Sequence, residues 1–129
     1  QPTLCLHLTQ RSCDVALGLP YNIAGYAFLL ELFSRLSGIP VGRFAHTLID
    51  AHVYTAKPDG DKSDYDHVPG LRQQLERSPR PLPTLAIDPT IRSLSDIEQL
   101  FDASTEDLLA TFALSGYAPH PAIQFKVAV

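Results

Sequence analysis

The segment Gln10–Asn22, with the sequence QRSCDVALGLPYN, constrains the fold of this chain more than any other. Apolar and polar residues alternate over residues 3–11 just before it, which predicts a half-buried strand. The small-residue turn that follows ends in Pro20, a residue suited to the first turn of a helix. Residues 21–37 are rich in Ala, Leu and Phe, and they stop at Gly38, which suits a left-handed helix end. The chain therefore opens with a strand, a tight turn and a long helix.

A second long strand is predicted at residues 43–54, which also alternate. We expect one of its faces, small and apolar, to pack on the helix, and this face consists of Ala45, Thr47, Ile49, Ala51 and Val53. Shorter strands are predicted at residues 84–87 and 107–114, the latter with a helical alternative. His7 is interpreted as a cross-strand or interface polar group, not as a catalytic one.

Two short helices complete the prediction. One covers residues 67–77, with Leu71 and Leu75 facing inward, and the other begins at a capping box, Ser95–Glu98. Because the long helix is apolar nearly all round, it should be central and buried. The predicted class is α+β, a mixed or mostly antiparallel sheet packed on a long buried helix, in one domain over residues 1–129.

The totals fit a globular protein. Its 129 residues suffice for one domain, and 45% are hydrophobic while 19% are charged. A net charge of −4 with no basic run argues against nonspecific nucleic-acid binding. We find no apolar stretch of membrane-spanning length and no signal peptide, so no membrane partner is expected.

The Cys and Met residues bear on the cellular compartment and on the extent of the chain. Cys5 lies on the predicted strand and Cys13 in the turn beyond it, too far apart to form a disulfide, so reduced thiols in a cytoplasmic protein are expected. The sequence holds no Met and begins within a predicted strand. We therefore expect it to be a piece of a longer protein.

Polar side chains of the Gln10–Asn22 segment indicate recognition of an anion and an amide. Arg11 offers a planar fork of donors for a phosphate or carboxylate, and Ser12 adds a hydroxyl. The amide of Asn22 donates and accepts at once, as a nucleobase edge requires. An ordinary strand exit with a helix cap would use the same residues. From the residues alone, cap and ligand contact are equally supported at Asn22.

A second polar group ends the strand predicted at residues 43–54. Asp50, His52 and Tyr54 are spaced by two and so share one face. An imidazole beside a carboxylate suits catalysis or metal binding, but zinc takes three or four such ligands. We favour hydrogen bonding to a sugar hydroxyl and expect no metal.

Four stretches, in order, resemble the thymidylate synthase family. They are residues 10–24, the D-x-H-x-Y motif at 50–54, the RPLP motif at 80–83, and the GYAPHP motif at 116–121 running on to the VAV ending at 127–129. Together they frame the chain as the C-terminal half of such an enzyme, which implies the family's α+β fold.

The resemblance implies a site for dUMP and one for 5,10-methylenetetrahydrofolate. The residues implied for dUMP are Arg11, Ser12, Cys13, Asp14, Asn22, His52, Val53 and Tyr54. Those implied for folate are Asp14, Leu17, Gly18, Tyr21 and Ala128.

Each implied residue has a role in the family. Arg11 and Ser12 would bind the dUMP phosphate, Asn22 the uracil edge, and His52 with Tyr54 the ribose hydroxyl. Related enzymes that hydroxymethylate dCMP carry Asp where this chain has Asn22, so Asn indicates uracil.

The folate contacts are implied in the same way. Asp14 would bond the pterin, and Ala128 with the terminal carboxylate would close over the folate. The implied reaction is a methyl transfer: a cysteine thiolate adds to the pyrimidine, and folate supplies methylene and hydride to give dTMP. Asn22 and Asp14 would assist as polar residues. Arginines from a partner subunit complete the family's phosphate site, which implies a homodimer with shared active sites, joined through sheets.

The chain also departs from the family pattern. The nucleophile belongs to a Pro-Cys-His motif upstream of residue 1, and neither Cys5 nor Cys13 occupies that position. This chain alone is therefore expected to be inactive. Ile49 replaces a usual Gly, Ala118 replaces an acidic residue, and residues 57–66 form a longer loop, interpreted as a solvated insertion.

Two other hypotheses remain open on these residues. The chain could be a catalytically inactive relative that binds a nucleotide or pairs with a partner subunit. A structural interaction domain is ranked last, because it leaves the polar face at residues 50–54 unexplained.

Overall fold

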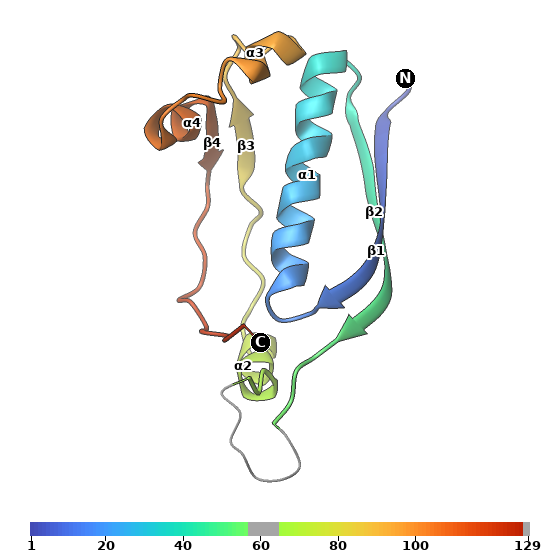
Figure 1. The fold of residues 1–129 in the computed structure, drawn as a ribbon, viewed down its shortest axis with the longest axis vertical. Helices are drawn as coiled ribbons and strands as arrows, with labels where there is room; N and C mark the ends of the chain where they lie inside the picture. Colours follow the sequence, from blue (N-terminus) through green and yellow to red (C-terminus); the bar gives the residue numbers. More distant parts are fainter. Residues whose placement is uncertain (57–64, 128–129) are drawn as a thin grey trace. The chain divides into compact units, whose positions relative to one another are not determined.

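The computed structural model describes residues 1–56 and 65–127. The chain divides into two compact units. Unit 1 comprises Gln1–Leu6, Tyr26–Ala45 and Pro81–Ala118, and unit 2 comprises His7–Gly25, His46–Arg80 and Pro119–Val129. In chain order the elements are β1 (Leu4–Asp14), α1 (Gly18–Ser37), β2 (Val41–His52), α2 (Val68–Leu75), β3 (Thr84–Ile87), α3 (Leu94–Glu98), α4 (Thr105–Thr111) and β4 (Phe112–Ser115) (Figure 1).

Strands β1 and β2 pair with each other in one sheet. The Leu4 N–H donates to the Pro40 carbonyl at 2.8 Å, and the Val15 N–H donates to the His52 carbonyl at 3.0 Å. Partners therefore advance together along both strands, so the pair is parallel, as the arrows of Figure 1 show. Parallel strands require a crossover connection, which α1 supplies.

Strands β3 and β4 form a second, antiparallel pair within unit 1, with Thr84 opposite Ser115 and Ile87 opposite Phe112. One parallel and one antiparallel pair, with several helices, are compatible with the predicted α+β class. The strand at residues 84–87 is confirmed. For residues 107–114 the structure divides the two alternatives, because α4 ends at Thr111 and β4 follows at once.

Helix α1 ends where the sequence predicted, and Gly38 takes the left-handed conformation with φ of 70°. Its burial is not confirmed. Only Leu30 and Leu32 of its side chains are buried, while Tyr21 is 79% and Phe33 49% exposed. No helix within the described ranges is long and apolar enough to span a membrane.

The prediction of which face of β2 packs on α1 is wrong. In unit 1, Tyr26 of α1 stacks on Phe44 with ring centroids 6.5 Å apart. Ala45 and Ile49 on the opposite face are exposed. The helix covers the face with the larger apolar side chains, because that face removes more apolar area from water.

Two smaller predictions are also corrected. Helix α3 forms, but its capping box uses Ser93 and Asp96 instead of Ser95 and Glu98. Leu75 of α2 is 85% exposed and does not face inward, because α2 ends at this residue.

Candidate functional site

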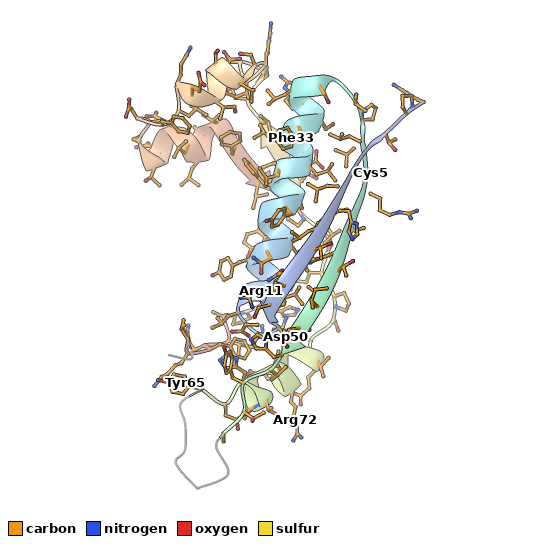
Figure 2. All side chains as sticks on the ribbon, turned by 45° about the vertical axis from the view of Figure 1, so that its right-hand side comes forward. Cys5, Arg11, Phe33, Asp50, Tyr65 and Arg72 are labelled. Carbon is orange, nitrogen blue, oxygen red and sulfur yellow. The ribbon has the colours of Figure 1, made fainter. Side chains whose placement is uncertain are left out.

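The candidate site lies in unit 2, where β1 and β2 end. Figure 2 labels Arg11 on β1 and Asp50 on β2 toward this end of the two strands. The hydrogen bond from Val15 to the His52 carbonyl holds the turn after β1 against the end of β2. Parallel pairing thus brings together two polar segments that are far apart in the sequence.

Asp14 shapes the turn between β1 and α1. Its Oδ1 accepts hydrogen bonds from the backbone N–H groups of Ala16 at 2.9 Å and Leu17 at 3.2 Å. This is the local turn geometry that Asp favours. Gly18 follows at the start of α1, and a Cβ built there would lie 3.5 Å from Asn22 Oδ1 and 3.7 Å from Asp14 Cβ. Asp14 and Asn22 therefore flank the same glycine.

Asn22 does not cap α1, because it lies inside the helix. Its Oδ1 accepts a hydrogen bond of 2.9 Å from Gln10 Nε2, which also donates to the Ser12 carbonyl at 2.8 Å. Gln10 Oε1 in turn lies 2.9 Å from His46 Nε2. With its oxygen held by Gln10, the Asn22 amide is left to donate through its NH₂ group.

His52 and Tyr54 lie together, as the shared face predicted. Their ring centroids are 5.2 Å apart in an edge-on arrangement. The His52 Nδ1 donates to the Asp50 carbonyl at 3.3 Å and lies 3.7 Å from the Asp50 carboxylate. A proton on Nδ1 leaves Nε2 of the neutral ring as an acceptor, which suits a hydroxyl donor.

Cys13 differs from the other residues of the segment because its side chain is fully buried. Burial raises the pKa of this thiol, and the neighbouring Asp14 carboxylate raises the pKa further. Its side chain is closed to a ligand, so only its backbone could take part in binding. Arg11 is exposed and Ser12 half-buried, on opposite faces of β1.

The remaining sequence-predicted residues are more open. Tyr21 is 79%, Val53 38% and Tyr54 37% exposed, while Leu17 is half-buried. Ala128 lies outside the described residues, and so does most of the loop at 57–66. Within residues 1–56 and 65–127, no group of three His, Cys, Asp or Glu side chains could hold a metal ion.

The structure adds residues that the sequence reasoning missed, namely Gln10, His46, His67 and Phe125. His67 is 1% exposed, and its Nδ1 lies 3.7 Å from Asp14 Oδ1. Its ring meets Tyr54 and Phe125 edge-on, with centroids 5.6 Å and 5.2 Å away. Gln10 did leave a signal, because it is a polar residue at an inward-facing position of an alternating strand.

Two other predictions about individual side chains are confirmed. Both cysteines are free thiols. His7 is a cross-strand group, because its Nε2 lies 2.8 Å from Thr47 Oγ1 on β2.

Comparison with known proteins gives the family. The thymidylate synthase family model matches residues 1–129. The thymidylate synthase of Saccharomyces cerevisiae (strain ATCC 204508 / S288c) is 38% identical over 129 residues, which cover 100% of this chain and 36% of the yeast protein. The chain belongs to the thymidylate synthase family, so the resemblance is confirmed. It spans about a third of the length of that relative.

Proposed function

We propose that the protein to which this chain belongs is a methyltransferase that converts dUMP to dTMP with 5,10-methylenetetrahydrofolate. Family membership over the whole chain supports this proposal. At the level of individual side chains, one observation supports the proposal. Asp14, Asn22, His52 and Tyr54 lie together where β1 and β2 end.

The dUMP site would use these groups as follows. Ser12 would bind the phosphate from the inward face of β1, and Arg11 would join it by reaching round the strand from the exposed face. The Asn22 NH₂ would donate to a uracil carbonyl. His52 Nε2 and the Tyr54 hydroxyl would hold the ribose hydroxyl, with Cys13 and Val53 contributing backbone contacts.

The folate site would lie beside it. The contacts of Asp14 described above use Oδ1, so Oδ2 would be the oxygen that bonds the pterin. Leu17, Gly18 and Tyr21 would line this pocket, and Ala128 would close it. No metal is proposed in either site.

The nucleophilic cysteine would come from outside these residues, because Cys13 is buried with a raised pKa. We place the enzyme in the cytoplasm as a homodimer with shared active sites. The free cysteines support this location, and the exposed face of β1 and β2, with Ile49 66% exposed, supports a sheet-to-sheet interface. Residues 1–129 would form a part of one larger domain.

The direct test is dihydrofolate formation by the full-length protein supplied with dUMP and methylenetetrahydrofolate. Asn22→Ala should lower kcat/KM about tenfold or more, because a hydrogen bond to the uracil is lost. Gln73→Ala is the matched control, since it removes an exposed amide on α2. Binding of dUMP without turnover would replace the enzyme by the catalytically inactive relative, and absence of both would refute the proposal.

A further inference from the structure

Among the described residues, His67 is the one polar residue that is buried, and the proposed reaction gives it no role. It stands directly before α2, and its backbone N–H donates to the Tyr54 carbonyl at 3.0 Å. Its ring lies edge-on to both Tyr54 and Phe125. It therefore contacts the end of the candidate dUMP site and the C-terminal segment, residues 119–127, at once.

The two ring nitrogens of His67 face different parts of unit 2. Nε2 lies 2.8 Å from the Lys126 carbonyl, which can only accept, so Nε2 carries a hydrogen and donates it. Nδ1 lies 3.7 Å from Asp14 Oδ1, beyond hydrogen-bond length, and has no hydrogen-bond partner among the described residues. A buried nitrogen without a partner is rare in folded proteins and calls for an explanation.

Around His67, helix α2 packs closely against the C-terminal segment. The Leu71 N–H donates to the His67 carbonyl at 3.0 Å within the first turn of α2. At Gly70 a Cβ would come within 2.5 Å of Phe125 Cε1 and 3.1 Å of Ile123 Cγ2. Helix α2 and the C-terminal segment are thus packed in close contact, and the hydrogen bond from His67 to the Lys126 carbonyl links them.

We propose that His67 is a positioning residue that fixes the C-terminal segment in register with Asp14. Its Nε2–H holds the segment at Lys126, while its Nδ1 faces the Asp14 carboxylate, which would bond the pterin. Because His67 already holds residues 119–127, binding folate beside Asp14 would lose less conformational entropy. The inference rests on the proposed function in one respect, namely that Asp14 serves folate.

The test compares variants of the full-length protein. His67→Phe keeps an aromatic ring and removes both nitrogens. It should raise the KM for methylenetetrahydrofolate about tenfold with little change in kcat, and leave dUMP affinity within about twofold. His67→Gln retains a donor that reaches the Lys126 carbonyl and should restore most of the folate affinity, whereas the shorter His67→Asn should not.

His120 provides the matched control. Its Nε2 donates to the Ser78 carbonyl at 2.9 Å and so tethers the same segment without facing Asp14. His120→Phe should raise the folate KM less than about twofold. An equal effect at both histidines would reduce His67 to a general structural tether and overturn the proposal.

Hydrogen exchange measured without ligands tests the role of His67 independently of the proposed function. The amides of residues 123–127 should exchange faster in His67→Asn than in the wild type, and at the wild-type rate in His67→Gln. If the wild type turns over no dUMP, the proposed function fails. The hydrogen-exchange rates of residues 123–127 still show whether His67 holds the segment. If exchange and folate KM are the same in the Gln and Asn variants, His67 does not position the segment.

Discussion

Gln10 Nε2 donates a hydrogen bond of 2.9 Å to Asn22 Oδ1, joining β1 to α1 across the turn that carries Asp14. The same side chain meets His46 of β2 through its Oε1. An Asn amide can be turned either way, and its hydrogen-bond partner decides which end faces outward. Gln10 therefore orients Asn22 so that, in the proposed dUMP site, its NH₂ group would be the end that meets the ligand.

Replacing Gln10 should weaken dUMP binding without removing any group that touches dUMP. Gln10→Leu leaves the Asn22 oxygen without its donor, so the amide loses its fixed orientation. We expect dUMP affinity, measured by calorimetry on the full-length protein, to fall about tenfold. Gln10→Glu should weaken binding as well, because a carboxylate accepts from the Asn22 NH₂ and turns the amide round. Gln73→Leu on the exposed side of α2 is the control, and an equal loss there would contradict the prediction.

The local patterns of the sequence predicted most of the elements of this fold. Alternation located β1 and β2, the apolar run located α1, and Gly38 marked its end. Each of these features depends on neighbours in the sequence, where propensity and periodicity act. The capping box was displaced by two residues because several Ser and Asp residues near Ser93 can take the same role.

Long-range partners could not be predicted in this way. The face of β2 that packs on α1 depends on which side offers more apolar area to a helix elsewhere in the chain, and periodicity treats both faces alike. The contacts of Gln10 with His46 and of His67 with Lys126 join residues far apart in sequence. The proposed roles of Asn22 and Asp14 came from the resemblance, and for Asn22 the local residues alone left a helix cap equally open.

A methyl group at Gly70 should loosen the C-terminal segment. In most helices Gly→Ala stabilises by up to about 1 kcal/mol, because Gly has more conformational freedom to lose. At Gly70 the new Cβ would lie 2.5 Å from Phe125 Cε1, so the aromatic ring has to move. Overpacking of this kind costs about 1–3 kcal/mol, which outweighs the gain.

Gly25 is the matched control for Gly70→Ala, since a Cβ there meets nothing within 4 Å. We expect Gly70→Ala to lower the thermal midpoint of the full-length protein and to speed proteolysis near Phe125. Gly25→Ala should leave both unchanged or raise the midpoint. A stabilised Gly70→Ala protein would show that the two segments are not in close contact.

Cys13 should be inert in the native protein in spite of its place in the candidate site. Its side chain is fully buried and its thiol pKa is raised, so little thiolate forms at neutral pH. Iodoacetamide followed by peptide mass spectrometry should label Cys13 only after denaturation. Cys13→Ala should cost about 1 kcal/mol of unfolding free energy through lost packing while dUMP affinity stays within about twofold. Rapid native labelling, or a large loss of dUMP affinity, would show that the sulfur reaches the ligand.

The first turn of α3 should lose its cap in acid. Asp96 accepts hydrogen bonds from the Arg92 N–H at 2.9 Å, and from the hydroxyl and N–H of Ser93 at 2.9 Å and 2.8 Å. These bonds favour the charged carboxylate, so they hold the pKa of Asp96 below its ordinary value of 3.8. A lowered folded-state pKa means that the cap stabilises the fold fully above the ordinary value. That stabilisation is lost as the pH falls through the lower, folded-state pKa.

An NMR titration of the full-length protein would follow this loss through the amide signals of Arg92 and Ser93. Both should shift together as the carboxylate is protonated, with a midpoint below pH 3.8. Asp96→Asn is the control, because its amide oxygen still accepts from both N–H groups but does not titrate in this range. Its signals should show no step there. A step at or above the ordinary value in the wild type would mean that these hydrogen bonds do not favour the carboxylate, and that the cap forms equally well with a neutral side chain.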